Sequence, residues 1–485
     1  MMTKASRRRF LKTSFLAGGM TAISTPHAWA APGPGEHVNL GMIGLGWRGV
    51  TLLDAFKQVA GVNIAAICDV DTALIDAQAK AYPQAKQYVD LRRMLDSPDI
   101  DAVVISTGNQ WHCLAAIWAM QAGKHVYVEK PLCNALWEGQ QVVKAAQKYG
   151  KICQVGTQQR SAPMQAEIKH LLHDEKLIGD IQWVRVNRFG LRPSIGKRAT
   201  PLVPPKTVDY DLWLGPAQDL PIYRDKFHYD WHWDWNTGAG EMGNWGVHIV
   251  DDVRNNVFRD AIPFPKSVVA GGGRFAWHDA GNTPNIHFAM LDTGSIPVVI
   301  GVANIAADAA NKKPPHCPGP TSGYIAYGEA GRMEGERGKA KFFDTDGTLI
   351  KEIKGTTGMV DHQQNFVDAI RNASPGSLMA PAHVGHHSTA WCNLANYAYR
   401  VGSDLRGQEH EDAGVEVKDD RAAGIWNDLR SLVAVHEGRQ TADSMRLGPQ
   451  LTFDSTQETF VGDHADVANR YLRVSGRKKF VVTAV

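Results

Sequence analysis

Three closely spaced glycines and a downstream aspartate are the residues whose spacing first suggests chemistry. Gly44, Gly46 and Gly49 follow a short apolar run, residues 38–43, and Asp69 lies twenty residues further on, at the end of the next apolar run. Such glycines permit a tight strand-to-helix turn, the approach of a pyrophosphate and close helix packing, and the helix N-terminus can bind phosphate. The pattern predicts a dinucleotide site. A nucleotide-free α/β domain with a glycine turn is the structural alternative.

The charge after the second apolar run bears on which dinucleotide is bound. Asp69 is predicted to accept hydrogen bonds from the adenosine ribose. A 2′-phosphate at that place would meet the negative charges of Asp69 and Asp71, so NAD is favoured over NADP. Arg48, near the same edge, leaves NADP open.

The composition excludes several classes of protein. A chain of 485 residues predicts two or three domains, and 44% hydrophobic with 21% charged residues excludes wholesale disorder. A net charge of +2 gives no reason to expect nucleic acid as a partner. The sequence contains no run of eighteen apolar residues, so no membrane span is predicted. The six cysteines form no Cys-x-x-Cys pair and are predicted to be small buried side chains.

The first thirty residues have the pattern of an export signal. Ser6–Lys12 contains a run of three arginines, an apolar stretch follows, and Ala28-Trp29-Ala30 offers a cleavage site. We expect a twin-arginine signal peptide over residues 1–30 and a linker over 31–36. The twin-arginine export machinery would then be a partner, with a periplasmic or secreted mature protein and no stable membrane association after cleavage. The alternative is a basic tail.

Strands and helices alternate from residue 37 to 157. This rhythm predicts a parallel sheet with helices on both faces, a doubly wound Rossmann domain. The expected strands cover 38–43, 62–68, 101–106, 125–128 and 152–155, and the expected helices follow the glycine motif and cover 72–82, 111–122 and 134–149.

The rhythm changes in the remainder, residues 158–485, where longer alternating runs predict a mostly antiparallel sheet and an α+β domain. We expect its helices to pack back on the first domain. The tail from 403 onward has no clear pattern. The expected strands cover 181–189, 267–275, 286–291 and 296–303 with hairpins at 324–336 and 340–353, and the expected helices cover 161–173, 360–372 and 386–402.

Three further segments carry a resemblance to a known family. They are Ser106–His112, Glu129-Lys130-Pro131 and Gly240–Asp251. Together with the glycine motif, their order and spacing over residues 38–400 resemble the Gfo/Idh/MocA family, the glucose–fructose oxidoreductase and inositol dehydrogenase group. The resemblance implies a Rossmann domain followed by a large open antiparallel sheet, whose face often makes an oligomer contact. A homo-oligomer is therefore expected.

The resemblance also implies which residues react. Lys130 matches a lysine that lies beside the nicotinamide and hydrogen-bonds the reacting sugar oxygen, where an ammonium stabilises a developing alkoxide. A cis bond before Pro131 fits this position. The family's Asp-x-x-x-His pair matches Asn244 and His248, which implies His248 as general base and Asn244 as its orienting partner. The expected cofactor-binding set is Gly44, Gly46, Trp47, Arg48, Gly49, Asp69, Ser106, Thr107, Asn109, His112, Glu129 and Lys130.

An aromatic segment just before this helix could bind sugar. Read as a strand, residues 229–235 place Tyr229, Trp231, Trp233 and Trp235 on one face, either as a platform for sugar C–H faces or as packing at a domain interface. The Asp and His residues of the other face are spaced too widely for a metal, and no metal is expected. Gln158, Gln159 and Arg160 follow the last Rossmann strand and could reach the cleft. The expected substrate-binding residues are Gln159, Arg160, Trp233 and Trp235.

Three functions agree with these features. The first is an NAD(P)-dependent oxidoreductase for a sugar hydroxyl carbon, with a tightly bound, recycled cofactor because an exported enzyme has no soluble nicotinamide pool. The second is an NAD-dependent glycoside-cleaving enzyme that oxidises its substrate transiently. The family's α-N-acetylgalactosaminidases carry a His-Gly-Leu-Gly segment and lack Glu-Lys-Pro, the reverse of this chain, so another elimination activity would be needed. The third is a non-catalytic sugar-binding protein.

Overall fold

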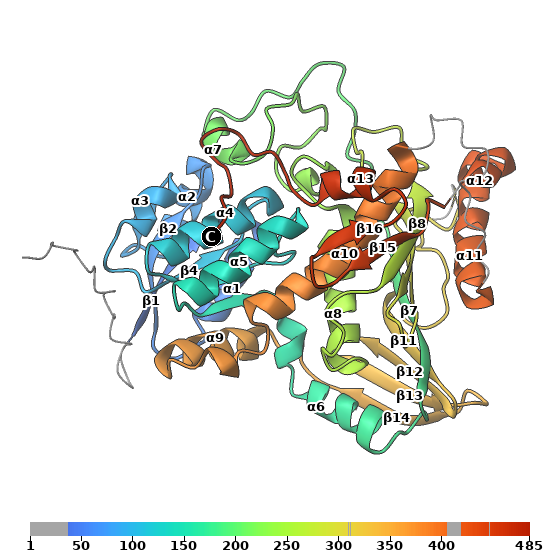
Figure 1. Ribbon diagram of the computed structural model, residues 1–485. Coiled ribbons are helices and arrows are strands. Elements are labelled where there is room, and N and C mark those ends of the chain that lie inside the picture. The colour runs from blue at the N-terminus through green and yellow to red at the C-terminus, as the bar shows by residue number, and fades with distance from the viewer. Residues whose placement is uncertain (1–36, 309, 311, 405–418, 446) are drawn as a thin grey trace, which may run out of the picture. The chain divides into compact units, whose positions relative to one another are not determined.

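The computed structural model describes residues 37–485 except 309, 311, 405–418 and 446 (Figure 1). The expected signal peptide, 1–30, and linker, 31–36, lie outside the described residues. The described residues belong to one unit of the chain, Pro32–Val485. Within them, no helix has the length and apolar character needed to cross a membrane.

The first sheet has six parallel strands in the order β3-β2-β1-β4-β5-β6. Its central strands are short, rich in valine and isoleucine and buried on both sides, as in β4, where every residue is buried. The strands are β1 (Val38–Ile43), β2 (Val62–Cys68), β3 (Lys86–Tyr88), β4 (Ala102–Ile105), β5 (His125–Val128) and β6 (Cys153–Val155). The helices between them are α1 (Trp47–Phe56), α2 (Thr72–Ala79), α3 (Leu91–Leu95), α4 (His112–Gln121) and α5 (Leu136–Lys148).

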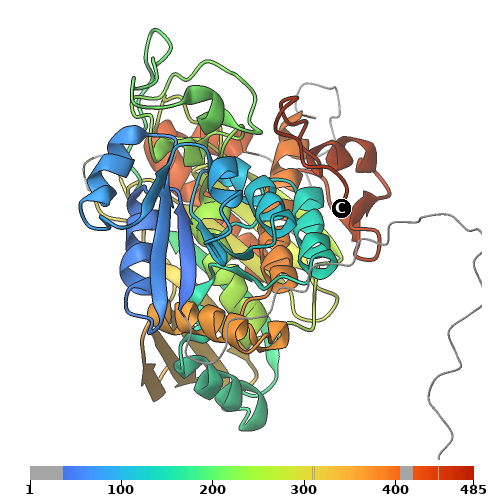
Figure 2. The same ribbon diagram turned by 90° about the vertical axis from the view of Figure 1, so that its left-hand side faces the viewer.

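Both faces of this sheet are covered by helices (Figures 1 and 2). On one face α1 packs with α9 (Met359–Arg371), where Phe56 meets Phe366 at 6.3 Å between ring centroids. On the other face lie α4 and α5. Because α9 comes from the C-terminal part of the chain, the first sheet is completed by a helix distant in sequence.

The second sheet has ten strands in the order β14-β13-β12-β11-β7-β10-β9-β8-β15-β16. Neighbouring strands are antiparallel except β7 and β10, which are parallel. The fold class predicted from the sequence is confirmed. The strands are β7 (Ile181–Phe189), β8 (Ser267–Gly273), β9 (Ile286–Asp292), β10 (Val298–Ala303), β11 (Ser322–Gly328), β12 (Gly331–Glu336), β13 (Lys339–Asp344), β14 (Leu349–Lys354), β15 (Leu451–Asp454) and β16 (Thr459–Val461).

Helices cover both faces of the second sheet as well. Helices α8 (Val247–Asn256) and α10 (Ala382–Asp404) pack on one face and share its largest apolar cluster, and α11 (Asp420–Glu437) packs on the other against Phe288 and Val299. Helix α11 and strands β15 and β16 come from the tail in which the sequence showed no clear pattern. The remaining helices are α6 (Met164–Lys169), α7 (Tyr210–Leu214), α12 (Arg439–Ser444) and α13 (Ala465–Ala468).

Two local predictions are wrong. Residues 229–235 do not form a strand: Tyr229 adopts a left-handed conformation, φ 68°, and a 3₁₀ turn follows over Asp230–Trp233. The ring of His232 contacts the carbonyl oxygen of Tyr229 through Nδ1 at 2.6 Å and closes that turn. The alternating aromatic face therefore does not exist. The helix expected over 161–173 begins only at Met164, after Pro163, and ends in a π turn, His170–Asp174.

Candidate active site

A cavity of about 600 Å³ lies at the carboxyl ends of the parallel strands. This is where open α/β sheets bind their ligands. One part is lined by the glycine turn and by Asp69. The other part, here called the lysine end, brings residues of both sheets' domains together. Its polar side chains are those of Lys130, Arg192, His232, Asn244, His248 and Arg337.

The glycine turn fits a dinucleotide. Gly44 has φ 92°, and a Cβ there would lie 2.3 Å from the carbonyl oxygen of Ser106. A Cβ on Gly49 would lie 2.0 Å from the carbonyl oxygen of Gly44, so the helix can pack this closely only as glycine. A Cβ on Gly46 would meet nothing within 4 Å, so there is open space beside the turn. No side chain caps α1, so the first N–H groups of this helix are available to a phosphate. The residues present therefore fit a pyrophosphate.

Asp69 is held in place by the backbone of the same turn. Its Oδ2 accepts a hydrogen bond from the amide of Leu45 at 2.6 Å, and its Oδ1 accepts one from the amide of Asp71 at 2.9 Å. Burial raises the pKa of Asp69, and the two backbone hydrogen bonds act against this rise. The carboxylate lines the cavity, as a ribose partner must.

Arg48 forms an ion pair within the cavity. Its guanidinium ion-pairs with Glu129, at the end of β5, with an Nη2–Oε1 distance of 2.6 Å. The pKa of Glu129 is lowered by Arg48 and Lys130 although burial acts to raise it. Arg48 thus lines the cavity from the β5 side, away from the Asp69 carboxylate at the end of β2.

Lys130 projects from the end of β5 toward the second domain. Its Nζ donates to the carbonyl oxygen of Asn244 at 2.7 Å and lies 3.4 Å from the Asn244 amide oxygen. The peptide bond to Pro131 is cis. Burial lowers the pKa of Lys130 to about 8, Glu129 opposes this change and Arg48 and Arg337 add to it. A lysine with this pKa can release and recover a proton near neutral pH.

His248 and Arg337 meet at the lysine end. Nη2 of Arg337 lies 3.4 Å from Nε2 and 3.5 Å from Nδ1 of the histidine ring. Burial lowers the pKa of His248 well below its ordinary value, and the charges of Arg337 and Lys130 lower it further. The imidazole is therefore neutral at pH 7 and can accept a proton.

Sequence reasoning missed several cavity residues. Arg337 lies in the turn between β12 and β13, and Arg192 and His232 come from the long segment after β7. His232 stacks on Trp231 at 3.7 Å between ring centroids, and burial lowers the pKa of His232 to about 3. Only the length of the segment, which holds little regular structure besides α7, indicated a functional loop. Nothing in the local sequence marks Arg337.

The four expected substrate residues lie outside the cavity lining. Gln159 donates to the carbonyl oxygen of Glu336 at 3.3 Å. Trp233 is buried under Arg192, whose guanidinium lies 5.4 Å from its ring centroid, and Trp235 lies under Arg400 at 5.2 Å. Both indoles pack against arginine side chains outside the cavity, as the packing alternative to a sugar platform expected.

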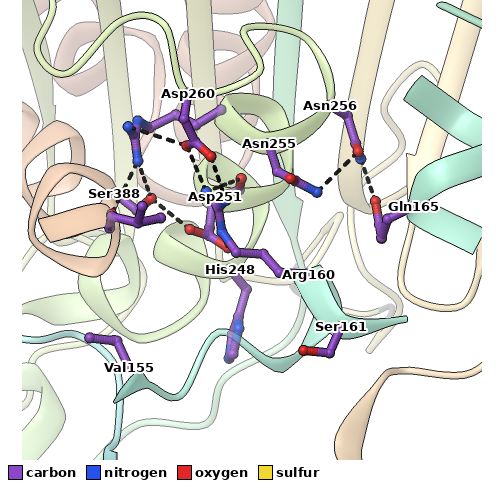
Figure 3. Close-up of polar contacts among 12 residues, drawn as sticks. Val155, Arg160, Ser161, Gln165, His248, Asp251, Asn255, Asn256, Asp260 and Ser388 are labelled. Atoms are coloured by element: carbon purple, nitrogen blue, oxygen red, sulfur yellow. Dashed lines mark hydrogen bonds and ion pairs between the residues drawn. The ribbon is translucent and has the colours of Figure 1, made fainter. Parts of the chain in front are cut away.

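The fourth expected substrate residue, Arg160, belongs to a buried ion-pair network, the Asp251 network (Figure 3). Its Nε lies 2.7 Å from Oδ2 of Asp251, and its Nη1 lies 2.7 Å from Oδ2 of Asp260. Ser388 donates to Oδ1 of Asp251 at 2.6 Å and accepts from Arg254 at 2.6 Å. The guanidinium of Arg160 is thus committed to structure.

The remaining sequence predictions concern the cysteines, metal ligands and the cofactor-binding residues. All six cysteines are free and buried, as predicted. Across the described residues, no group of three or more His, Cys, Asp or Glu side chains is arranged to hold a metal ion. Apart from Gly49, which packs beneath the turn, every residue of the expected cofactor-binding set lines the cavity, together with His248 and Asn244.

Comparison with known proteins identifies the family. Residues 38–157 match the family described as the Gfo/Idh/MocA oxidoreductase family with an NAD-binding Rossmann fold, and residues 194–308 match its C-terminal α/β domain. The chain belongs to the Gfo/Idh/MocA oxidoreductase family.

Two curated relatives come from Shewanella. A glycosyl hydrolase family 109 protein of Shewanella pealeana is 35% identical over 176 residues, and an α-N-acetylgalactosaminidase of Shewanella oneidensis is 33% identical over 179 residues. Each match covers 31% of this chain and 39% of the relative, so the chain spans about two fifths of the relatives' length. These relatives belong to the branch that the absent His-Gly-Leu-Gly segment argued against.

A solved structure shares the fold. The WlbA dehydrogenase of Bordetella pertussis, in complex with NADH and UDP-GlcNAcA, is similar with a TM-score of 0.53 at 20% identity. The match covers 73% of this chain and 94% of that one. At this identity the likeness concerns the arrangement of the two domains.

Proposed function

We propose that the protein is an NAD(P)-dependent oxidoreductase that acts on a hydroxyl-bearing carbon of a sugar or sugar derivative. One observation carries the proposal: the Nζ of Lys130 leaves the Rossmann sheet and meets Asn244 of the second domain, in the same cavity as the glycine turn. An amine held between a dinucleotide-binding turn and a second domain can serve the oxygen of a carbinol.

Lys130 would handle the proton and the charge of the reacting hydroxyl. A bound nicotinamide dinucleotide supplies the hydride acceptor or donor. As a neutral amine, Lys130 accepts the hydroxyl proton during oxidation. As an ammonium, it stabilises a developing alkoxide and returns a proton during reduction. A pKa of about 8 makes both forms available near neutral pH.

Asn244 and His248 would assist from the second domain. The carbonyl oxygen of Asn244 fixes the direction of the Lys130 amine. His248 is neutral and faces the cavity, so it can accept a proton from a second substrate hydroxyl. Asn244 carries no charge, so the orientation of His248 depends on contacts such as Arg337 rather than on an aspartate.

The test begins with the cofactor. The protein is purified without added nucleotide and denatured, and the supernatant is assayed for NAD(H) and NADP(H). About one equivalent supports a retained cofactor. Sugars are then offered with and without NAD and NADP, and absorbance at 340 nm is followed for the wild type and Lys130→Ala. A protein that neither contains nor binds a dinucleotide would refute the proposal.

Glycoside cleavage with a transiently reduced cofactor is the second candidate. The names of the Shewanella relatives favour it. The lysine end also offers two proton acceptors, Lys130 and His248, one for the hydroxyl and one for the carbon acid that a ketone would create beside it. In such a cycle the hydride returns to the substrate, so water is the sole co-reactant. Release of an aglycone from a p-nitrophenyl glycoside, without added NAD, would distinguish it from net oxidation.

The N-terminal sequence supports a further part of the proposal, export by the twin-arginine route to the periplasm or beyond. Fractionation of cells that produce the wild type or the Arg7→Lys/Arg8→Lys variant tests it, since the variant should stay in the cytoplasm. A homo-oligomer stays a prediction, which sedimentation of the purified protein can decide.

A further inference from the structure

Positive charge is in excess at the lysine end of the cavity. Two buried carboxylates approach it, and each faces two cations. Glu129 ion-pairs with Arg48 at 2.6 Å and lies beside Lys130. Glu241 ion-pairs with Arg188 at 2.7 Å and with Arg192 at 3.0 Å. These carboxylates neutralise part of the charge and leave a surplus.

Arg337 adds a cation without a carboxylate partner. Across the described residues it forms no ion pair, and its buried Nε has no hydrogen-bond partner. Its Nη2 faces neutral groups, the ring of His248 and, when the amide of Gln158 is turned to present its oxygen, that oxygen at 2.7 Å. Asp252 and then Glu129 attract its charge without forming an ion pair. Burial, followed by the charge of Asp251, raises the pKa of Asp252 well above its ordinary value, so this carboxyl is a weaker counter-charge than an ordinary aspartate.

The guanidinium of Arg337 is nevertheless held in a defined place. It lies 5.0 Å from the ring centroid of Trp245, and Arg188 lies 4.6 Å from the same ring. Trp245 itself lines the cavity. An aromatic face orients a guanidinium while leaving its N–H edge free.

A half-buried cation without a counter-charge costs free energy that an entering anion would recover. A dinucleotide would place its phosphates at the N-terminus of α1, beside the glycine turn, so they would not neutralise the lysine end. The histidines leave this balance unchanged, because His232 and His248 have lowered pKa values and carry no charge. An anionic group on the substrate can supply the missing negative charge.

We propose that the substrate is an acidic sugar, a uronic acid or a related sugar carboxylate, whose carboxylate is bound by Arg337. This inference rests on the proposed sugar oxidoreductase function and names its substrate class. The planar N–H edge of a guanidinium matches the two oxygens of a carboxylate. Arg337 then acts as a specificity residue, and Lys130 serves the reacting hydroxyl at the same end of the cavity.

The experiment compares each acid with neutral forms of the same sugar. D-glucuronate, D-galacturonate and D-mannuronate are offered with the matching hexoses and with the uronate methyl esters, which keep the shape and remove the charge. In the wild type we expect kcat/KM for an acid to exceed that for its ester at least tenfold. Arg337→Gln should lower the acid-to-ester ratio about 10- to 100-fold, the value of a charge-assisted hydrogen bond. Arg337→Lys should recover part of the ratio.

A matched control lies on β12, the strand that leads into the turn of Arg337. Arg332 ion-pairs with Glu334 at 2.9 Å and covers the ring of Phe343 outside the cavity lining. Arg332→Gln removes one positive charge from the same hairpin and should leave the acid-to-ester ratio unchanged. A similar loss of ratio in both variants would mean a general effect of charge and would overturn the assignment of Arg337.

Further outcomes separate the inference from the proposed function. Equal turnover of acids and esters, or an equal loss for both in Arg337→Gln, overturns the inference and leaves the function intact. A preference for glucose 6-phosphate over the uronates overturns the carboxylate assignment. If the protein neither contains nor binds a dinucleotide, the proposed function fails. In that case, or if none of these sugars is turned over, binding decides the inference: uronates should raise the melting temperature of the wild type more than that of Arg337→Gln.

Discussion

Helix α8 contributes to two polar groups, through Asp251 to one and, one helical turn earlier, through His248 to the other. The two groups differ in how their charges are paired. The Asp251 network joins Arg160, Asp251 and Asp260 with matched partners at 2.7 Å, closed by Ser388. Three residues earlier in the same helix, His248 belongs to the lysine end. Figure 3 shows its ring pointing away from the network.

The difference lies in how the charges are balanced. In the Asp251 network Asp251 and Asp260 both pair with Arg160, and Arg254 lies 3.3 Å from Asp260, so each cation has a carboxylate or hydroxyl partner. At the lysine end Arg337 and Lys130 donate to carbonyl or amide groups and the histidines are neutral. A buried network with complete pairing holds a fold together, whereas a set of cations with incomplete pairing is available for chemistry. The segment after β6 contributes to both groups, because Gln158 faces Arg337 at the lysine end and Arg160 pairs with Asp251 in the network.

The largest expected effect comes from breaking the closed network. Arg160→Met leaves Asp251 and Asp260 buried without their main partner, and we expect the free energy of unfolding to fall by about 3–5 kcal/mol. Urea titration followed by circular dichroism measures it. Arg337→Met, which removes an unpaired cation, should change the free energy of unfolding by less than about 1 kcal/mol. If the two variants lost the same stability, the distinction between the two groups would be wrong.

The next effect concerns catalysis alone. Lys130→Ala removes the group that serves the reacting oxygen, and kcat should fall about 10²- to 10³-fold, as for the loss of a transition-state hydrogen-bond donor. Steady-state kinetics with the sugar found active measures this loss. Fluorescence titration should find NAD affinity changed less than about tenfold, since the glycine turn is intact. Lys144→Ala, an exposed lysine of α5, is the control. A Lys130→Ala enzyme with wild-type kcat would refute the site assignment.

The sequence predicted the nucleotide half of this molecule well because its signals are local. The glycine spacing, Asp69 and the buried apolar strands each specify a structure over a few residues, and all five strands predicted for the first sheet have the predicted bounds or differ from them by at most one residue at each end. Lys130 and His248 were found through the family resemblance. They lie in one cavity because a strand end of the first domain faces a helix start of the second.

The lysine end could not be predicted because its residues come from segments distant in the chain. Arg337 lies about ninety residues after His248 in an ordinary hairpin turn, and only the pairing of β12 with β13 places it against the histidine. The aromatic segment was misread for a related reason. The left-handed Tyr229 starts a 3₁₀ turn, which a two-residue alternation of tryptophans does not reveal. Likewise, Arg160 gave no sign that two acids 91 and 100 residues away would pair with it.

The titration of Lys130 gives the third expected effect, a pH dependence of several-fold. Its pKa is lowered to about 8, so the neutral amine gains population as pH rises through 8. Oxidation needs the amine as proton acceptor, and its kcat should rise with pH to a plateau above about 9, whereas reduction needs the ammonium and should slow over the same range. His248 is already neutral, so no limb near pH 6.5 should occur. Rate profiles from pH 6 to 10 in both directions measure this, and parallel profiles would contradict it.

The smallest expected effect tests whether the lysine end depends on being short of negative charge. Asn244→Asp introduces a carboxylate about 3.4 Å from the Lys130 amine, where Asn244 now presents its amide oxygen. An opposite charge at this distance should raise the pKa of Lys130 by about one unit or more and move the rising limb of oxidation to higher pH. Asn244→Ser, which adds no charge, is the control for the lost amide. The new charge would also lie near Arg337, so we expect weaker binding of uronates relative to their esters. If Asn244→Asp left both the pH profile and the acid-to-ester ratio unchanged, the charge imbalance would not govern the site. The contrast between the lysine end and the Asp251 network would then have no functional meaning.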